Sequence, residues 1–501
     1  MESFEYLLQG FVTACSGWNL LYSLIGVSFG MFVGVLPGLG PTAGTALLLP
    51  LTFGMQPVCA VIMLAGIYYG AMYGGTITSV LINTPGESAS LITCLDGYPM
   101  ARQGRAGTAL GVAAIGSFIG GMIALAILIF VGPLVASQAL KFGPPEYFAL
   151  VVVGLSLLIG LMGKSLVRGM IAALFGLTLA FIGIDSVTGT MRFTFGQESL
   201  EDGLEFVSLA MGLFGLSEIF ITAEENLHTQ AQKPPKIQNM MPRPEEWSPT
   251  LKAILRGSGI GVLLGLIPGT NSVIPTILSY SIEKKVADDP SRFGKGAIEG
   301  VAGPETANNA YAGAALIPLF TLGIPSSPSV AILLGAFIMH GLTPGPTLMQ
   351  KNPEFVWGVI ASMFVGNAIL LFMNLPMANM WAQITRIPFK VLLPNILIVM
   401  ILGAYSINSS LFDVGMMLAF GILGYFMKKV EFPLGPVLLT FVLGKILETS
   451  LMKSLTIFDG NFWGFFQRPI SATLLTIAIL ILTVSSYFGW KDKGISGDSE
   501  I

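Results

Sequence analysis

Histidine, cysteine and charge are all scarce in this sequence. Its 501 residues include two histidines, His228 and His340, and three cysteines, Cys15, Cys59 and Cys94. The cysteines have no CxxC spacing, which argues against a zinc site or a disulfide framework. Catalysis based on histidine has few possible participants. We therefore expect no enzymatic activity, no cofactor and no transition-metal site.

Charged residues make up 11% of the chain, and the formal net charge is −3. An ordinary soluble domain carries about 25% charged residues. Basic patches with interleaved aromatic residues are absent, which excludes a nucleic-acid partner. The first residues, MESFEYLLQGFV, lack a basic segment and a small-residue cleavage site. We expect them to form an interfacial segment and not a removed signal peptide.

Apolar residues, in contrast, make up 53% of the chain. They form runs of about 17 to 25 residues from end to end, as helices that cross about 30 Å of hydrocarbon require. The sequence therefore predicts an all-α polytopic membrane protein with about 11 to 12 spans, embedded in a lipid bilayer.

A polar stretch over residues 224–252 divides the chain into an N-terminal half, 1–223, and a C-terminal half, 253–490, with a tail at 491–501. The two halves share motifs. GMFVGVLPGLGPTAGT at 30–45 resembles GVLLGLIPGTNSVIPT at 261–276, with an offset of 231 residues. More loosely, LINTPGESASL at 81–91 resembles TLGIPSSPSVA at 321–331, with an offset of 240 residues between Pro85 and Pro325. The chain therefore contains an internal repeat.

The distribution of basic residues indicates that the two repeats face opposite sides of the membrane. Short cytoplasmic loops collect lysine and arginine. In the first half the loop TFGMQP has no basic residue, whereas the loop after the second motif carries Arg102 and Arg105. In the second half the order is reversed, because EKKVADDPSRFGKG is rich in basic residues and HGLTPGP has none. On this scheme the linker, Lys428, Lys429 and the tail are cytoplasmic.

In the arrangement of spans that fits this orientation, each first motif forms a re-entrant hairpin and each second motif forms the break in a long helix. The hairpins cover 20–54 and 253–283, and the broken helices cover 58–97 and 298–340. The remaining spans are predicted at 107–135, 147–163, 167–185, 204–222, 355–377, 391–407, 411–427, 433–450 and 469–489.

Glycine and proline inside apolar helices need a reason. In a bilayer an unpaired backbone group costs several kcal/mol, so irregular backbone persists only where protein, water or a ligand satisfies it. Secondary transporters use such breaks to point the N-termini of half-helices at an anionic substrate, while carbonyls and half-helix C-termini bind the coupling cation. We expect the breaks in the two halves to line one polar chamber.

The residues of the breaks are the candidate ligands. Glycines let the backbone approach a ligand, and hydroxyl and amide groups bind a carboxylate or a sodium ion without leaving a buried charge. The predicted substrate-binding residues are Pro37, Gly38, Leu39, Gly40, Thr42, Asn83, Thr84, Gly86, Ser88, Gly269, Thr270, Asn271, Ser272, Ser326, Ser327 and Ser329. A tight turn that only lets helices pack closely is the alternative explanation for the glycines.

Acidic residues amid apolar runs indicate cation binding or proton exchange. The predicted cation-binding residues are Gly38, Asn83, Glu87, Thr270, Glu305, Asn308 and Asn309. Helical spacing places Glu305 on one face with Asn308 or Asn309. Helix capping alone is the alternative for Glu87, and a capped cytoplasmic helix end is the alternative for Glu305.

These motifs together resemble the large membrane subunit of the tripartite tricarboxylate transporter family, TctA. The likeness extends over about residues 5–490 and rests on long motifs in the same order, among them GVLPGLGPTAGTALLLPLTF, LINTPGESASLITCLDGYPMARQG and FGKGAIEGVAGPETANNA. The family's glycine-rich signature corresponds to Pro37–Gly40, and its second signature corresponds to Pro304–Asn309. The chain departs from the family at Asn271, Ser326 and Pro328, where glycine-rich forms are usual, and this leaves the substrate's identity open.

The resemblance implies uptake of carboxylates such as citrate across the bacterial inner membrane, driven by sodium. It also implies a small TctB-like membrane subunit and a periplasmic TctC-like binding protein as partners. A cation-coupled importer that works by alternating access at a midplane site is therefore the leading hypothesis. An anion channel of similar build is the alternative. An intramembrane hydrolase using Ser88 and Glu87 lacks a credible base and nucleophile pair.

Overall fold

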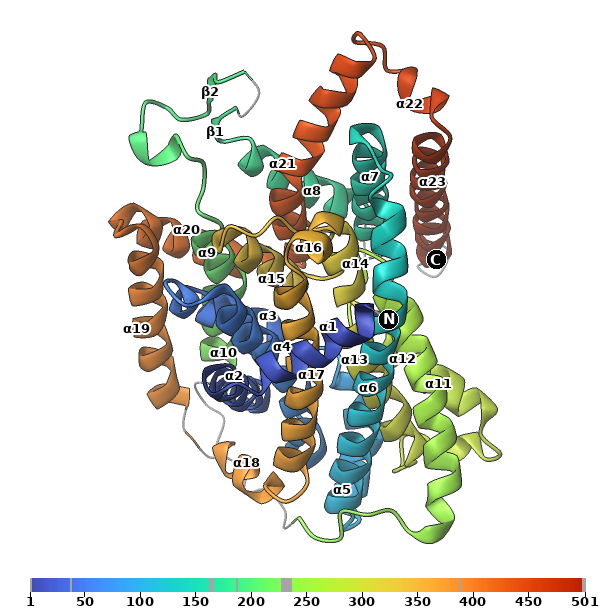
Figure 1. Cartoon of the computed structure of the whole chain (residues 1–501). Helices are drawn as coiled ribbons and strands as arrows, with labels where there is room; N and C mark the ends of the chain where they lie inside the picture. The colour runs from blue at the N-terminus through green and yellow to red at the C-terminus, as the bar shows by residue number, and fades with distance from the viewer. Residues whose placement is uncertain are drawn as a thin grey trace.

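The computed structural model describes residues 2–36, 38–161, 166–185, 188–226, 237–385, 387 and 389–497. It is almost entirely helical (Figure 1), and strands in the described part of the chain are limited to β1 (Gly183–Ile184) and β2 (Met191–Arg192). The predicted all-α polytopic class is confirmed. Pro37, residues 227–236 of the predicted linker and residues 498–501 of the predicted tail lie outside the described residues.

The N-terminal half begins with a short helix, which is followed by the helices that the motifs at 30–45 and 81–91 interrupt. Its helices are α1 (Glu2–Ala14), α2 (Gly17–Val35), α3 (Gly40–Leu48), η1 (Leu49–Thr52), α4 (Pro57–Ile82), α5 (Leu91–Arg102), α6 (Ala106–Ala139), α7 (Pro144–Leu161) and α8 (Leu166–Ala180). After the two strands follow η2 (Glu198–Leu200), α9 (Phe206–Ala210), the π-helical η3 (Met211–Leu216) and α10 (Ser217–Asn226).

The C-terminal half is also helical. It comprises η4 (Pro244–Glu246), α11 (Trp247–Gly265), α12 (Val273–Val286), η5 (Pro290–Arg292), α13 (Glu299–Ala314), α14 (Leu316–Leu322), α15 (Pro328–Met339) and α16 (Pro346–Lys351). Then come α17 (Pro353–Asn374), α18 (Ala378–Ile384), α19 (Phe389–Asn408), α20 (Leu411–Lys429), α21 (Leu434–Ile457), α22 (Gly464–Gln467) and α23 (Pro469–Gly497). Helix α11 starts inside the predicted linker, where the Glu246 carboxylate accepts from the Arg243 backbone N–H at 2.9 Å.

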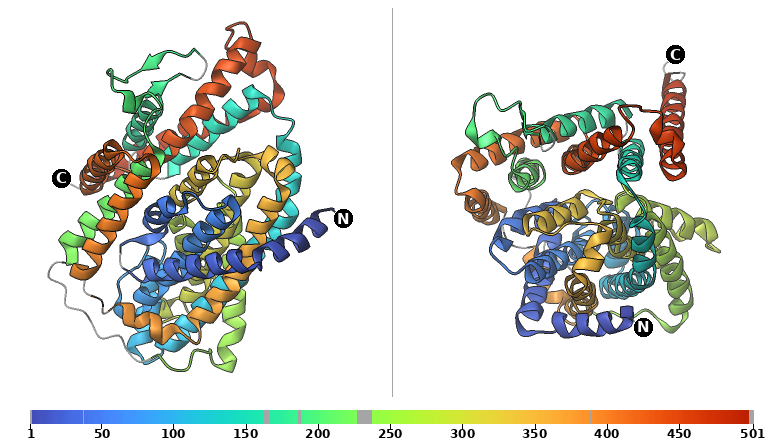
Figure 2. Two further views of the ribbon diagram at one scale, coloured as in Figure 1. Left: turned by 60° about the vertical axis from the view of Figure 1, so that its left-hand side comes forward. Right: turned by 45° about the horizontal axis from the view of Figure 1, so that its top comes forward.

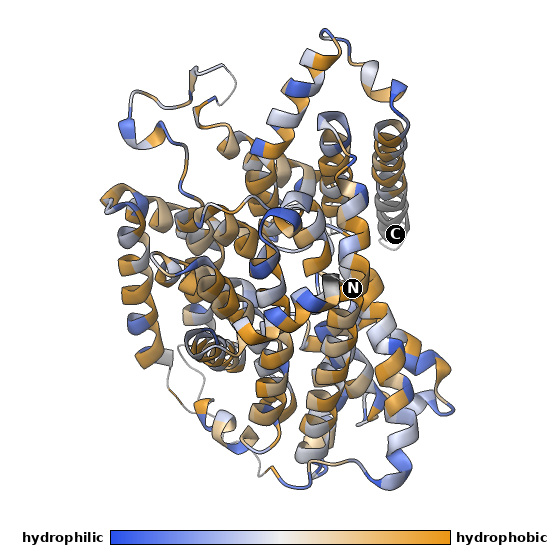
Figure 3. Ribbon diagram, viewed as in Figure 1, coloured by the Kyte–Doolittle hydropathy of each residue, from blue (hydrophilic) through white to orange (hydrophobic). Residues whose placement is uncertain are grey.

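Nine helical segments within the described residues are long and apolar enough to cross a membrane. Apolar residues predominate in the helices (Figure 3). Two of these helices, α19 and α23, are mostly exposed along their apolar windows, as lipid-facing helices would be. Every predicted span corresponds to a helix, and both predicted long helices are broken, at 83–90 and at 323–327.

Helices α4 and α13 form the centre of the fold. Every residue of α13 is buried, and α4 is buried from Cys59 to Leu81. Helix α2 packs along α4, and α11 packs along α13. A second layer, in which α7, α8, α21 and α23 pack together and α20 packs against η3 and α10, lies beside this bundle (Figure 2).

Glycines produce both central contacts. A Cβ at Gly26, Gly30 or Gly34 of α2 would lie 2.2–2.4 Å from a backbone oxygen of α4, those of Met63, Ile67 and Ala71. A Cβ at Gly257, Gly261 or Gly265 of α11 would lie 2.3–2.8 Å from those of Gly303, Ala307 and Tyr311 of α13. The glycines are related by the offset of 231 residues and the oxygens by the offset of 240. Small residues thus let both helix pairs approach closely, as is usual in membranes.

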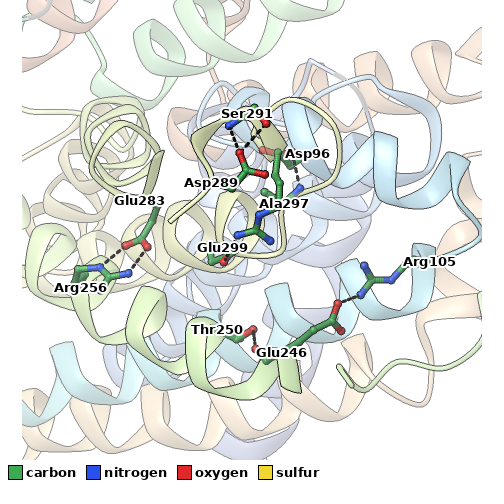
Figure 4. A network of polar contacts seen from close by, with 11 residues as sticks. Asp96, Arg105, Glu246, Thr250, Arg256, Glu283, Asp289, Ser291, Ala297 and Glu299 are labelled. Atoms are coloured by element: carbon green, nitrogen blue, oxygen red, sulfur yellow. Dashed lines mark hydrogen bonds and ion pairs between the residues drawn. The ribbon is translucent and has the colours of Figure 1, made fainter. Parts of the chain in front are cut away.

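Ion pairs gather where α5, α6, α11, α12 and the loop before α13 meet (Figure 4). Arg105 contacts Glu246 at 2.5 Å, and Arg292 contacts Glu299 at 2.9 Å. Arg256 pairs with the buried Glu283 through two nitrogens. This cluster contains the basic loops that the sequence assigns to the cytoplasm.

Candidate functional site

The four breaks in the central helices line one cavity of about 630 Å³. The breaks lie between α2 and α3, α4 and α5, α11 and α12, and α14 and α15. Each break contributes residues to the cavity wall: Gly38–Ala43, Thr84–Ser88, Asn271–Val273 and Ser327–Ser329. Two breaks come from each half of the sequence, so the cavity lies where the repeated motifs meet.

Left-handed backbone conformations end or reverse the helices at these breaks. Helix α4 ends at Asn83, whose φ is 56°, and α14 ends at Gly323, whose φ is 72°. Gly38, before α3, and Gly40, its first residue, have φ of 88° and 55°. Glycine adopts such angles without steric penalty, and asparagine tolerates them better than most residues. The glycine-rich motif therefore serves the turn itself.

Helix N-termini face the cavity. Helix α3 contributes its first residues, Gly40 to Ala43, and α15 contributes Pro328 and Ser329. Proline lies in the first turn of each, where its missing N–H removes no helical hydrogen bond. The first N–H groups of a helix have no intrahelical acceptor, and together with the helix dipole they attract anions.

Side chains join the two halves across this wall. The hydroxyls of Thr42 and Ser329 are 2.7 Å apart, so α3 of the first half and α15 of the second are hydrogen-bonded. The Glu87 carboxylate accepts from the Asn308 Nδ2 at 2.6 Å. The Asn271 side chain accepts from Val273 N at 3.1 Å and so caps α12. Both halves are therefore needed to form the site.

A buried polar network lies behind the wall. The Glu305 carboxylate accepts from Thr76 at 2.7 Å and also from Thr93, so α13 is tied to α4 and α5. Asn309 Nδ2 donates to Ser117 Oγ at 2.7 Å. Neither Glu305 nor Glu87 takes part in an ion pair within the described part of the chain.

The side-chain oxygens of Asn308 and Asn309 are buried and have no hydrogen-bond donor among the described residues. Burying an acceptor without a donor costs free energy of about 1 to 3 kcal/mol. These two amide oxygens and the Glu305 carboxylate belong to one turn of α13, next to the cavity wall. Together they offer only oxygen atoms, which hard cations prefer.

The cavity takes in most of the predicted substrate ligands. Those on its wall are Gly38, Leu39, Gly40, Thr42, Thr84, Gly86, Ser88, Asn271, Ser272, Ser327 and Ser329, together with Glu87 from the cation set. Glu305, Asn308 and Asn309 lie behind the wall and do not line it. Pro37 falls outside the described residues.

Four predicted ligands, Asn83, Gly269, Thr270 and Ser326, lie off the wall, each for a local reason. Asn83 forms the exposed left-handed end of α4. Gly269 packs against the backbone of Leu158. The hydroxyls of Thr270 and Ser326 donate to backbone carbonyls, each at 2.9 Å. Hydroxyls near a break often satisfy freed carbonyls in this way.

The remaining part of the wall comes from the second layer, and sequence reasoning missed it. Phe214 of the π-helical segment, Glu218 and Thr222 of α10, and Lys428 of α20 line the cavity. The Lys428 ammonium forms an ion pair with the Glu218 carboxylate. An acidic residue inside the predicted span 204–222 was the available signal, because such residues are functional by default. Lys428 was expected in a cytoplasmic loop, whereas α20 continues to Lys429.

Comparison with known proteins identifies the family of this chain. The tripartite tricarboxylate transporter TctA family matches residues 20–439 of the chain. The chain belongs to this family. As expected from the motifs, it is therefore a multi-pass membrane protein of a tripartite transport system, and its family role is transport.

Two relatives of this TctA-family chain come from Agrobacterium vitis. One, described as an uncharacterized 52.8 kDa protein in the TAR-I ttuC' 3'region, is 45% identical over 97% of this chain and 96% of its own length. The other, an uncharacterized protein in the TAR-II ttuC' 3'region, is 45% identical over 45% of this chain and 93% of its own length. No solved structure matches the chain.

Proposed function

We propose that this chain is the large membrane subunit of a cation-coupled importer of di- and tricarboxylates in the bacterial inner membrane. It works with a small TctB-like membrane subunit and with a periplasmic TctC-like binding protein that delivers the substrate. The observation that carries the proposal is the single cavity lined by all four helix breaks.

The size and lining of the cavity suit a small carboxylate. Its volume of about 630 Å³ falls within the range of about 300–1,000 Å³ typical of small-molecule sites. The N-termini of α3 and α15 and the hydroxyls of Thr42, Ser88, Ser327 and Ser329 provide donors on the wall. Charge-assisted bonds of this kind, from backbone N–H groups and hydroxyls to a carboxylate, are short and strong.

The charge of the wall supports coupling to a cation. Glu87 and Glu218 face one basic residue, Lys428, so the ionised wall has a formal charge of −1. A dicarboxylate would raise the negative charge of the occupied cavity to −3 without a further cation. Burying unpaired charge is strongly unfavourable. We propose that the Glu305 carboxylate and the unpartnered side-chain oxygens of Asn308 and Asn309, behind the wall, bind this cation and that the cation is sodium.

Repetition of the helix pairs supports alternating access at this site. The α2–α4 and α11–α13 contacts use equivalent residues at the offsets that relate the sequence motifs. The basic loops of the two halves favour opposite orientations. Inverted repeats that place broken helices around one site are typical of secondary transporters.

The test is uptake into proteoliposomes that contain this chain, its small partner and the binding protein. A panel of labelled acids that includes succinate and citrate is offered with an inward sodium gradient, with equal sodium on both sides, and without sodium. We expect accumulation only with the gradient. Uptake that merely equilibrates and ignores sodium would indicate a channel, and no uptake of any di- or tricarboxylate would refute the proposal.

A further inference from the structure

The cavity contains one side chain that can meet a carboxylate with full positive charge. Among the described residues on its wall, Lys428 is the single basic one, and it is paired with Glu218. The two side chains are 22% and 23% exposed, so the pair is accessible from the cavity. They come from α20 and α10, which pack against each other.

A second pair next to it shows what an ordinary surface contact looks like in this protein. Lys429 contacts Glu224 at 2.5 Å, and the two side chains are 44% and 50% exposed. Neither residue lines the cavity, and Glu224 also accepts from the Tyr425 hydroxyl at 2.9 Å. Consecutive lysines thus form matched ion pairs, one inside the cavity and one on the surface.

The inner pair lies beside the glycine-rich break. A Cβ at Gly38 would lie 2.7 Å from Thr222 Oγ1 and 3.3 Å from Glu218 Oε1. The tip that leads into α3 therefore packs directly on the wall that carries the ion pair. A substrate with one carboxylate at the N-terminus of α3 would extend toward Lys428.

We propose that Lys428 determines specificity by binding a second carboxylate of the substrate, and that Glu218 remains paired with Lys428 as long as no second carboxylate is bound. The inference rests on the proposed function. An incoming carboxylate replaces the Glu218 carboxylate at the Lys428 ammonium. A monocarboxylate bound at the helix N-termini leaves the Lys428–Glu218 pair intact, so Lys428 adds nothing to its binding free energy. The site therefore favours acids with two or more carboxylates.

Opposite effects of the two partners distinguish this role from a structural ion pair. Lys428→Met should raise the succinate or citrate concentration that gives half-maximal uptake by about 10- to 100-fold, the worth of a charge-assisted hydrogen bond. Lys428→Arg should restore most of the affinity. Glu218→Gln should lower the half-maximal concentration, because it removes the competitor for Lys428.

The matched controls are Lys429→Met and Glu224→Gln, which should change the half-maximal concentration less than 2-fold. Butyrate has one carboxylate, so its inhibition constant for uptake of the labelled acid should be the same in the wild type and in Lys428→Met. Monodisperse elution and the unfolding temperature of each purified complex show whether a variant is folded.

Two results would overturn the inference. One is a Lys428→Met variant that behaves like Lys429→Met. The other is a loss of affinity in Glu218→Gln equal to that in Lys428→Met, with recovery in the double variant, as expected for a salt bridge that only holds α10 to α20. Failure of the wild type to take up any di- or tricarboxylate would instead contradict the proposed function.

Discussion

Replacing Asp96 with alanine should release the loop between α12 and α13. Asp96 belongs to α5 and is fully buried. One of its carboxylate oxygens accepts three backbone N–H groups of that loop, from Gly294 at 2.9 Å, Gly296 at 2.7 Å and Ala297 at 2.8 Å. The other accepts from the Tyr280 hydroxyl at 2.9 Å. Figure 4 shows Asp96 beside Ala297. One side chain of the first half thus holds a loop of the second.

The size of the effect follows from these bonds. A hydrogen bond to a charged group contributes about 1.5 to 3 kcal/mol. Desolvation of the buried carboxylate offsets part of this, so we take the low end, which gives about 4.5 kcal/mol for the three N–H bonds. The open form of the loop should then become about 2,000-fold more populated. Asp96→Asn keeps a neutral acceptor and should lose about half as much free energy, because charge-assisted bonds are about twice as strong.

Limited trypsin digestion measures the opening, because the loop contains Arg292 and Lys295. Cleavage there follows the population of the open form when opening is fast. The rate should rise from wild type through Asp96→Asn to Asp96→Ala, while Asp288→Asn, an exposed change in the same loop, should leave it unchanged. Equal cleavage of wild type and Asp96→Ala in folded protein would refute the reasoning.

Three further outcomes are expected. Replacing Gly38 or Gly269 with valine should abolish uptake without preventing membrane insertion. The backbone φ is 88° at Gly38 and 82° at Gly269, and an added Cβ would lie 2.7 Å and 2.6 Å from the nearest atom, respectively. Normal uptake by these variants would show that transport does not depend on the shape of the breaks. Gly30→Leu should reduce the yield of folded protein, since a Cβ there would lie 2.4 Å from a backbone oxygen of α4, and gel-filtration profiles would report it. Glu87→Gln and Glu305→Gln should alter the sodium dependence of uptake more than the preference among acids, and an unchanged sodium response would assign both residues to structure.

The breaks were predictable because they depend on local chemistry. Proline and glycine interrupt a helix wherever they occur, and a bilayer makes each interruption expensive. The spacing of the motifs also indicated that Glu305 shares a helix face with its asparagines. That face lies behind the cavity wall, because the glycines of α11 set how α13 is turned. Sequence alone does not give this rotation.

The part of the wall formed by α10 and α20 was not predictable for a different reason. Lys428 and Glu218 are 210 residues apart, and neither belongs to a repeated motif. Positive charge at the end of a helix is typical of a cytoplasmic boundary, so Lys428 had an ordinary explanation. Its function as part of the cavity wall depends on how α20 packs against α10, which is a tertiary contact.

If the chain works by the alternating access proposed above, the contacts between the halves predict which parts move. Thr42–Ser329 and Glu87–Asn308 connect the breaks of the two halves, and Asp96 connects α5 to the loop before α13. The broken helices therefore form one unit, and the wall that carries Lys428 belongs to the second layer. Alternating access that moves this unit against the second layer would keep the contacts between the halves.

A cross-link between the halves tests this motion. Gln103 Nε2 donates to the Lys295 carbonyl at 2.7 Å, so cysteines at positions 103 and 295 lie within reach of a short bis-maleimide. The exposed Cys15 is replaced with serine beforehand. We expect the cross-linked protein to retain uptake, because both positions belong to the same unit. Loss of uptake on cross-linking, reversed when a cleavable reagent is cut, would mean that the two halves separate from each other in every transport cycle.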